Sequence, residues 1–230
     1  MGCVIVKIND TTWRMEDGVV RFFLLTGTER ALLIDSGMMT HDAKDIAERL
    51  TKLPVSLLNT HSDGDHTGSN AQFAKVYMHP AEESLYRSKG GTAEILPVRG
   101  GDVIDLGGRP LEIIEMPGHT PGSITVLDVN ARVLVGGDPV QNGRIYMFGN
   151  HRSMRNYNCS MKLLAERIGD FDEVWPSHSS IPVKPDLIPR LIAGSEAILK
   201  GAASYTIEEM RGMKIRVYDM GYATFLCDEA

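Results

Sequence analysis

The chain alternates short apolar runs with polar and glycine-containing turns, and many of the runs are rich in Val, Ile and Leu. Runs of this length and composition are typical of strands buried within a sheet. We therefore expect strands at residues 3–8, 19–26, 31–35, 55–59, 75–78, 111–115, 123–128, 132–136 and 173–175. Two further apolar segments, residues 214–218 and 222–227, flank Met220 and Gly221 and predict a closing hairpin.

Helical periodicity falls between these strands. Residues 43–50 place their apolar side chains on one helical face, as an amphipathic helix does. Ser153 is a good N-cap for a later helix. The pattern predicts helices at residues 43–50, 80–87, 154–168 and 185–199, and a short one at 68–74. Strands that alternate with helices predict an α/β fold, and without an internal linker we expect one domain over residues 1–230.

The largest concentration of candidate metal ligands lies directly after the strand predicted at residues 55–59. Six residues contain four candidate metal ligands, which are His61, Asp63, Asp65 and His66. Imidazole and carboxylate groups are ligands for divalent transition metals. Because side chains two apart in an extended segment point the same way, His61 and Asp63 can share one metal ion. The run therefore predicts at least part of a metal site.

Three later segments each place a further His or Asp directly after an apolar run. These residues are His119, Asp138 and His178. In α/β proteins the loops at strand ends usually carry the functional groups. The sequence thus predicts a metal site with seven candidate ligands: His61, Asp63, Asp65, His66, His119, Asp138 and His178.

This set of motifs resembles the metallo-β-lactamase fold superfamily over about residues 2 to 227. The family pattern is an Asp at a strand end, His-x-His-x-Asp-His, a later His, a bridging Asp and a last His. Asp35 matches the strand-end Asp and is expected to support the site without binding metal. Asp63 departs from the pattern, since the family usually has His there. The resemblance implies a four-layer αββα sandwich with the metal site at one edge of its two sheets.

The resemblance also implies a hydrolase related to zinc-dependent hydrolases and glyoxalase II. Two divalent ions would be bridged by Asp138, with a catalytic part for Asp65, and a metal-bound, bridging hydroxide would cleave an ester, thioester or lactone of a small molecule. Zinc is the expected metal. Iron or manganese is the alternative, because Asp63 adds a third carboxylate that suits harder ions.

Two other functions stay open at this point. The family's di-iron oxygen and nitric oxide reductases carry a carboxylate, usually Glu, where this chain has Asp63. Such a redox protein would need a separate electron donor. The third reading is a degenerate member that binds metal without turnover. Six matching ligands and the lack of a redox domain favour the hydrolase.

The segment 141–157 follows Asp138 and mixes Gly, Asn, Arg and aromatic residues with little periodicity. Loops between metal ligands are where a substrate meets the metals. Tyr146, Arg152 and Tyr157 are therefore candidate substrate-binding residues, and an ordinary surface loop is an equally good interpretation.

Composition narrows the remaining classes. The net charge of −6, without a Lys/Arg run, disfavours nucleic-acid binding. No apolar stretch approaches the roughly 20 residues that span a bilayer. Three cysteines without a close pair suggest a reducing compartment, and the start of the chain resembles a strand more than a signal peptide, so we expect a cytoplasmic protein. Apolar groups near residues 146–148 suggest a homodimer.

Overall fold

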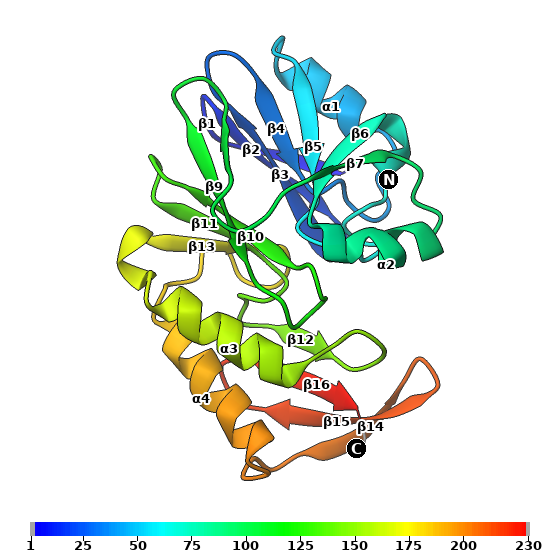
Figure 1. The fold of residues 1–230 in the computed structure, drawn as a ribbon, viewed down its shortest axis with the longest axis vertical. Helices are drawn as coiled ribbons and strands as arrows, with labels where there is room; N and C mark the ends of the chain where they lie inside the picture. The colour runs from blue at the N-terminus through cyan, green and yellow to red at the C-terminus, as the bar shows by residue number, and fades with distance from the viewer. Residues whose placement is uncertain (1–2, 229–230) are drawn as a thin grey trace.

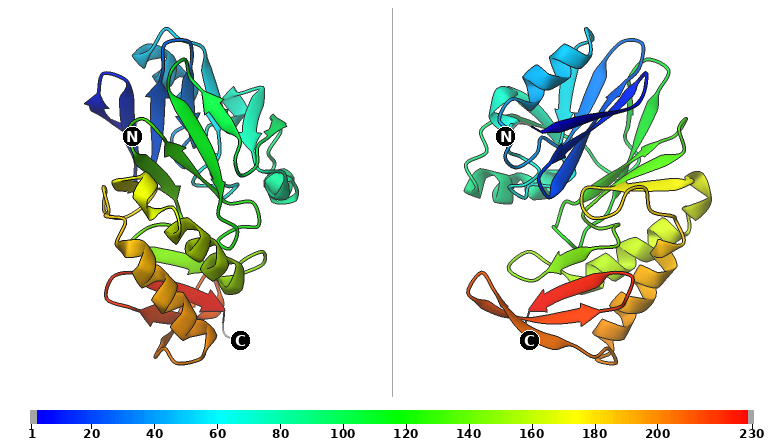
Figure 2. Two further views of the ribbon diagram at one scale, coloured as in Figure 1. Left: turned by 60° about the vertical axis from the view of Figure 1, so that its left-hand side comes forward. Right: turned by 180° about the vertical axis from the view of Figure 1, so that it is seen from behind.

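The computed structural model describes residues 3–228. A seven-stranded sheet and a five-stranded sheet face each other, and a third, four-stranded sheet lies beyond them at the C-terminal end (Figures 1 and 2). The seven-stranded sheet runs in chain order through β1 (Val4–Asn9), β2 (Thr12–Asp17), β3 (Val20–Thr26), β4 (Ala31–Ile34), β5 (Val55–Leu58), β6 (Lys75–Met78) and β7 (Glu94–Pro97). Its first four strands pair antiparallel and its last four pair parallel.

The five-stranded sheet has the order β13-β11-β10-β9-β8. Its strands are β8 (Val103–Asp105), β9 (Pro110–Glu115), β10 (Ile124–Asp128), β11 (Val133–Gly137) and β13 (Glu173–Pro176). The third sheet has the order β12-β16-β15-β14, formed by β12 (Arg144–Met147), β14 (Thr206–Met210), β15 (Met213–Asp219) and β16 (Thr224–Asp228). β15 and β16 are the closing hairpin expected from the sequence.

Strand alternation builds the layers, because neighbouring residues of a strand face opposite sides of its sheet. On β3, Phe23 and Leu25 belong to the core between the two large sheets. Phe22 and Leu24 face the other way, into a core shared with Ile46 of the helix α1 (Ala43–Leu50). Each apolar face of this strand is therefore buried, which explains its continuous hydrophobic run.

The helices α3 (Met154–Ala165) and α4 (Leu187–Leu199) cover the outer face of the five-stranded sheet. Leu164 and Leu191 share one buried cluster with Leu134 of that sheet and Phe225 of the third sheet. The four-layer αββα sandwich is thereby confirmed. The third sheet is an addition that sequence periodicity revealed only in its closing hairpin, and Figure 1 shows α3 between it and the five-stranded sheet.

The expected helix at residues 68–74 is wrong. That segment forms turns and a single 3-10 turn, Asn70–Gln72. Its polar groups bond to neighbouring loops instead of to a helix ladder: Ser69 Oγ donates to the Thr40 carbonyl at 2.8 Å and Asn70 Nδ2 to Asn59 Oδ1 at 2.7 Å. The expected helix at residues 80–87 is a 3-10 turn, Pro80–Glu82, followed by α2 (Glu83–Ser88). Over the described part of the chain, no helix is both long and apolar enough to cross a membrane.

Candidate metal centre

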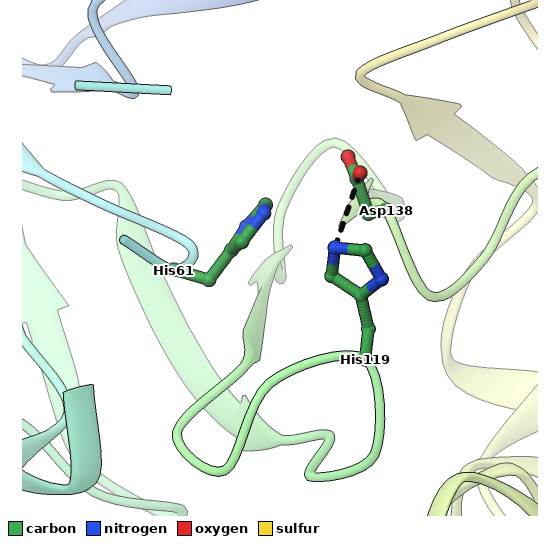
Figure 3. A group of neighbouring side chains, drawn as sticks. All are labelled: His61, His119 and Asp138. Atoms are coloured by element: carbon green, nitrogen blue, oxygen red, sulfur yellow. Dashed lines mark ion pairs between the residues drawn. The ribbon is translucent and has the colours of Figure 1, made fainter. Parts of the chain in front are cut away.

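Loops at the ends of four strands bring the expected ligands together. His61 follows β5, His119 follows β9, Asp138 follows β11 and His178 follows β13. The two large sheets are thus both represented, so the site lies at their common edge. Figure 3 shows the side chains of His61, His119 and Asp138 converging from separate segments of the chain.

The donors fall into two groups. The first contains His61, His119 and Asp138, and the second contains Asp65, His66 and His178; within each group the ligand atoms lie within 4.8 Å of one another. Asp138 faces both groups: its Oδ2 lies 3.3 Å from His119 Nε2, and its Oδ1 lies 3.1 Å from His66 Nε2. Tetrahedral zinc with bonds of about 2.0–2.1 Å needs donors about 3.4 Å apart. The spacing therefore fits metal ligation.

Each ligand imidazole is held by its other nitrogen, and His61 Nδ1 lies 3.1 Å from Thr60 Oγ1. His66 Nδ1 contacts Asp35 Oδ2 at 2.8 Å, His119 Nδ1 contacts the Tyr146 carbonyl at 2.9 Å, and His178 Nδ1 contacts the Val19 carbonyl at 2.7 Å. Such bonds fix the ring orientation and leave Nε2 as the ligand atom.

Among residues 3–228, four buried ligand atoms lack a hydrogen-bond partner: His61 Nε2, His66 Nε2, His119 Nε2 and Asp138 Oδ1. A buried polar atom without a partner costs free energy, so this cluster requires an explanation. All four point into the two groups just described. Divalent metal ions satisfy these atoms, and imidazole and carboxylate are their usual ligands. The residues present therefore fit the expected metal ions.

Charge in the second group favours a bound cation. Burial works against ionised Asp65, but a hydrogen bond with His178 and the charge of His66 lower its pKa to about 2. Burial likewise disfavours protonated His178, yet Asp138 and Asp65 raise its pKa to about 10. Ionised carboxylates around these imidazoles thus hold either a proton or a metal ion, and the two compete.

Asp63 lies beside the first group and is held by two cations. Its Oδ2 is 3.3 Å from His119 Nε2 and 2.6 Å from Arg152 Nη2, and its Oδ1 is 2.8 Å from Lys89 Nζ. Arg152 also donates to the His119 carbonyl. Burial opposes ionisation, but the close contacts with His119 and His61 and the charge of Arg152 hold the pKa of Asp63 well below its usual range. The Asp63 carboxylate is therefore ionised, and Lys89 and Arg152 offset most of its negative charge.

Asp35 supports the site from behind the ligands. It accepts bonds from the main-chain N and the hydroxyl of Thr60, both at 2.8 Å, in addition to its contact with His66. Its backbone has φ of 64°, a left-handed conformation that is uncommon for a residue other than glycine. The side chain thereby ties the end of β4 to the loop that carries both His61 and His66.

Glu82 is a positioning residue that sequence reasoning missed. Its fully buried carboxylate accepts from the Ser62 main-chain N at 2.8 Å, the Ser62 hydroxyl at 2.6 Å and the Gly122 main-chain N at 2.7 Å. It therefore joins the His61 loop to the His119 loop. The sequence held no signal for this role, because Glu82 opens an ordinary-looking helical segment.

Gly118 explains how His119 reaches the site. Its φ is +148°, and a Cβ there would lie 2.5 Å from the backbone N of Tyr157. Any other residue at position 118 would push the His119 loop away from α3. The glycine is needed for this close approach.

A cleft of about 1280 Å³ opens onto both ligand groups. Two of the candidate substrate-binding residues, Tyr146 and Arg152, line this cleft. Tyr157 does not fit that expectation: its ring is fully buried in the α3 core and its hydroxyl donates to the Pro139 carbonyl at 2.9 Å. The ring lies on the buried, apolar face of α3, so Tyr157 is a core residue.

Comparison with known proteins identifies the class. A family model described as the metallo-beta-lactamase superfamily matches residues 15–178, well over half of the chain. The chain belongs to this superfamily and is a metal-binding hydrolase of that class. A metallo-beta-lactamase from Pontibacter korlensis has the same fold, with a TM-score of 0.70 at 20% identity over 84% of this chain and 99% of that one. The FIM-1 enzyme from Pseudomonas aeruginosa in its mono-zinc form has a TM-score of 0.70 at 17% identity, over 86% of this chain and 96% of that one.

One curated relative is named as a thioesterase and another as a hydrolase of hydroxyacylglutathione. The human acyl-coenzyme A thioesterase MBLAC2 is 29% identical over 202 residues, covering 68% of this chain and 71% of that protein. A hydroxyacylglutathione hydrolase from Gloeobacter violaceus is 28% identical over 144 residues, covering 60% of this chain and 55% of that enzyme. The chain thus spans about half the length of that second relative.

Proposed function

We propose that this protein hydrolyses a small-molecule thioester with the help of two zinc ions. The observation that carries the proposal is the set of four buried, unpartnered ligand atoms grouped around Asp138. The relatives named for acyl-coenzyme A and hydroxyacylglutathione chemistry support a thioester over an oxygen ester or a lactone. When bound, the ions would supply a Lewis acid and an activated water.

The side chains of the site divide the remaining work. The first ion would be held by His61, His119 and Asp63, the second by Asp65, His66 and His178, and Asp138 would reach both ions, since its two oxygens face different groups. Asp65 is part-exposed to the cleft, with Oδ2 3.3 Å from His178 Nε2. We propose that the Asp65 carboxylate accepts a proton from the attacking water, because a carboxylate within hydrogen-bond distance of a reacting group can act as a general base.

Zinc is favoured over iron by the surroundings of Asp63. A third ligand carboxylate on its own would lower the positive charge of the site and suit harder ions. Lys89 and Arg152 contact that carboxylate and offset its charge. The site then keeps the electrophilic character that hydrolysis needs.

The direct test is thiol release from acyl thioesters by zinc-loaded protein, with Asp138→Asn as the matched control. We expect release that is proportional to the zinc content and absent in the control. The proposal fails if the zinc-loaded protein releases no more thiol than Asp138→Asn. Copurified iron with charge-transfer absorption, together with oxygen consumption in the presence of a reductant, would instead support a di-iron redox protein.

A further inference from the structure

One wall of the cleft belongs to the third sheet. Arg144 and Tyr146 lie on the same side of β12, since they are two residues apart and Ile145 between them is buried. The guanidinium of Arg211, from the turn between β14 and β15, lies over the Tyr146 ring with 5.9 Å to its centroid. Both arginines line the cleft.

These two arginines differ from the other cations of the cleft. Arg21 pairs with Glu16 at 3.2 Å, while Lys89 and Arg152 both pair with Asp63. Within residues 3–228, Arg144 and Arg211 form no ion pair with a carboxylate, and both side chains are exposed. They therefore present two uncompensated positive charges to whatever enters the cleft.

A second part of the cleft wall is apolar. Val19 and Met38, from loops beside the seven-stranded sheet, line the cleft with 70% and 39% of their surface exposed. The Val19 carbonyl bonds His178, so this wall adjoins the second ligand group. Large apolar side chains with this exposure gain free energy when an apolar group covers them.

The charge on one side of the cleft also differs from that of the molecule as a whole. The chain carries a net charge of −6, yet unpaired arginines face one side of the cleft. A local positive field in a cleft attracts anionic ligands and raises their association rates. Guanidinium groups bind phosphate and carboxylate through paired, charge-assisted hydrogen bonds.

We propose that Arg144 and Arg211 bind the anionic thiol half of the thioester, while Val19 and Met38 contact an apolar acyl half. This inference rests on the proposed thioester hydrolysis and specifies its substrate class: an apolar acyl group on a thiol that carries phosphate or carboxylate. The two walls of the cleft match the two halves of such a molecule.

The test compares three butanoyl thioesters with the same acyl group. The thiol is coenzyme A (phosphates), glutathione (carboxylates) or N-acetylcysteamine (uncharged). The variants are Arg144→Gln and Arg211→Gln, and the control is Lys214→Gln, which removes an exposed charge from β15 outside the cleft lining. A charged hydrogen bond contributes about 1.5–3 kcal/mol, so each arginine variant should lower kcat/KM at least about 10-fold for the charged thioester that the site selects.

The pattern of losses identifies the anion. A loss with the coenzyme A thioester alone assigns the arginines to phosphate, and a loss with the glutathione thioester assigns them to carboxylate. The uncharged thioester should change less than about twofold, and Lys214→Gln should not change any of the three. Equal losses for all three thioesters, or none for the charged ones, would overturn the inference.

A binding measurement separates this inference from the proposed hydrolysis. S-propyl-coenzyme A is a thioether that cannot be hydrolysed, and calorimetry gives its Kd for each variant without turnover. If no thioester is hydrolysed but Arg144→Gln and Arg211→Gln weaken thioether binding about 10-fold, the anion site stands and the hydrolysis proposal falls. In the other case, the parent protein hydrolyses thioesters, and the arginine variants match it both in thioether binding and in turnover of the glutathione thioester. The anion-site inference is then wrong, while the hydrolysis proposal stands.

Discussion

The two ligand groups of the metal centre are built differently. The second group, with Asp65, His66 and His178, keeps the superfamily pattern and is partly open to the cleft. The first group, with His61, His119 and Asp138, is buried and has Asp63 beside it where the superfamily usually has histidine.

The difference shows how a changed ligand is accommodated. At Asp63 the chain adds two cations from separate segments, Lys89 after α2 and Arg152 before α3. An ionised buried carboxylate without partners would be costly, and paired charges reduce that cost. The first group is therefore a modified site that carries its own compensation, while the second is unmodified.

The largest expected effect comes from the residue that the two groups share. Asp138→Asn should lower the metal content of both groups and reduce thioester turnover by about 1000-fold or more, because several kcal/mol of transition-state stabilisation depend on the metals. Metal analysis of the purified variant, alongside its rate, checks this. Retention of both metals would mean that Asp138 does not link the groups.

Arg152→Gln tests whether the first group depends on its added cations. The variant leaves Asp63 with one cation fewer, so we expect both zinc ions to stay bound and turnover to fall about 10–100-fold. Arg155→Gln, an exposed arginine on α3 outside the cleft lining, is the matched control and should behave as the parent protein. In an Asp63→Asn background, Arg152→Gln should add little, since coupled residues are not additive. An additive loss would show that Arg152 acts independently of Asp63.

Glu82→Gln tests the carboxylate that joins the His61 and His119 loops. Burial disfavours its ionised form, but the hydrogen bond from Ser62 and the charge of His61 hold its pKa below the ordinary 4.5. A carboxyl with a lowered folded-state pKa adds stability above its unfolded pKa and loses it as pH falls through the folded value. At neutral pH the variant should lose about 2–4 kcal/mol of unfolding free energy.

Denaturant unfolding at several pH values measures this loss. The difference between Glu82→Gln and the parent protein should shrink below about pH 4.5. Glu83→Gln is the control, because this neighbouring side chain is exposed and, within the described residues 3–228, pairs only with Arg87 at 3.8 Å; it should cost under about 0.5 kcal/mol. A pH-independent difference would show that the charge of Glu82 is not what stabilises the loops.

Tyr157→Phe has the smallest expected effect. The change removes one hydrogen bond from a buried hydroxyl to the Pro139 carbonyl, so stability should fall by about 1 kcal/mol. Thioester kcat/KM should stay within about twofold of the parent value. A selective rise in KM would restore Tyr157 as a substrate-binding residue.

The sequence predicted nine of the twelve strands of the two large sheets, because strands such as β3 and β4 are buried on both faces and appear as continuous apolar runs. It missed β2, β7 and β8. Short or exposed strands gave weaker signals. β12 and β14 carry charged and exposed residues, and their places are determined by pairing with β16 and β15 from distant parts of the chain. That pairing cannot be deduced from local periodicity.

The site shows the same division. His61, Asp65, His66, His119, Asp138 and His178 could be found because each follows an apolar strand in a recognisable motif. The roles of Glu82 and Lys89 depend on contacts with residues that lie 20 and 26 positions away in the sequence. Only the fold brings these residues together. Tyr157 was misjudged because the sequence does not show which face of α3 is buried.

The measurement that tests the central account most directly is metal content and thiol release on the same sample. Protein purified without added metal is analysed for zinc and iron, then assayed with butanoyl-coenzyme A and butanoyl-glutathione. We expect two zinc ions per chain and thiol release that disappears on chelation and returns with zinc. Two irons per chain with no thiol release would contradict the account.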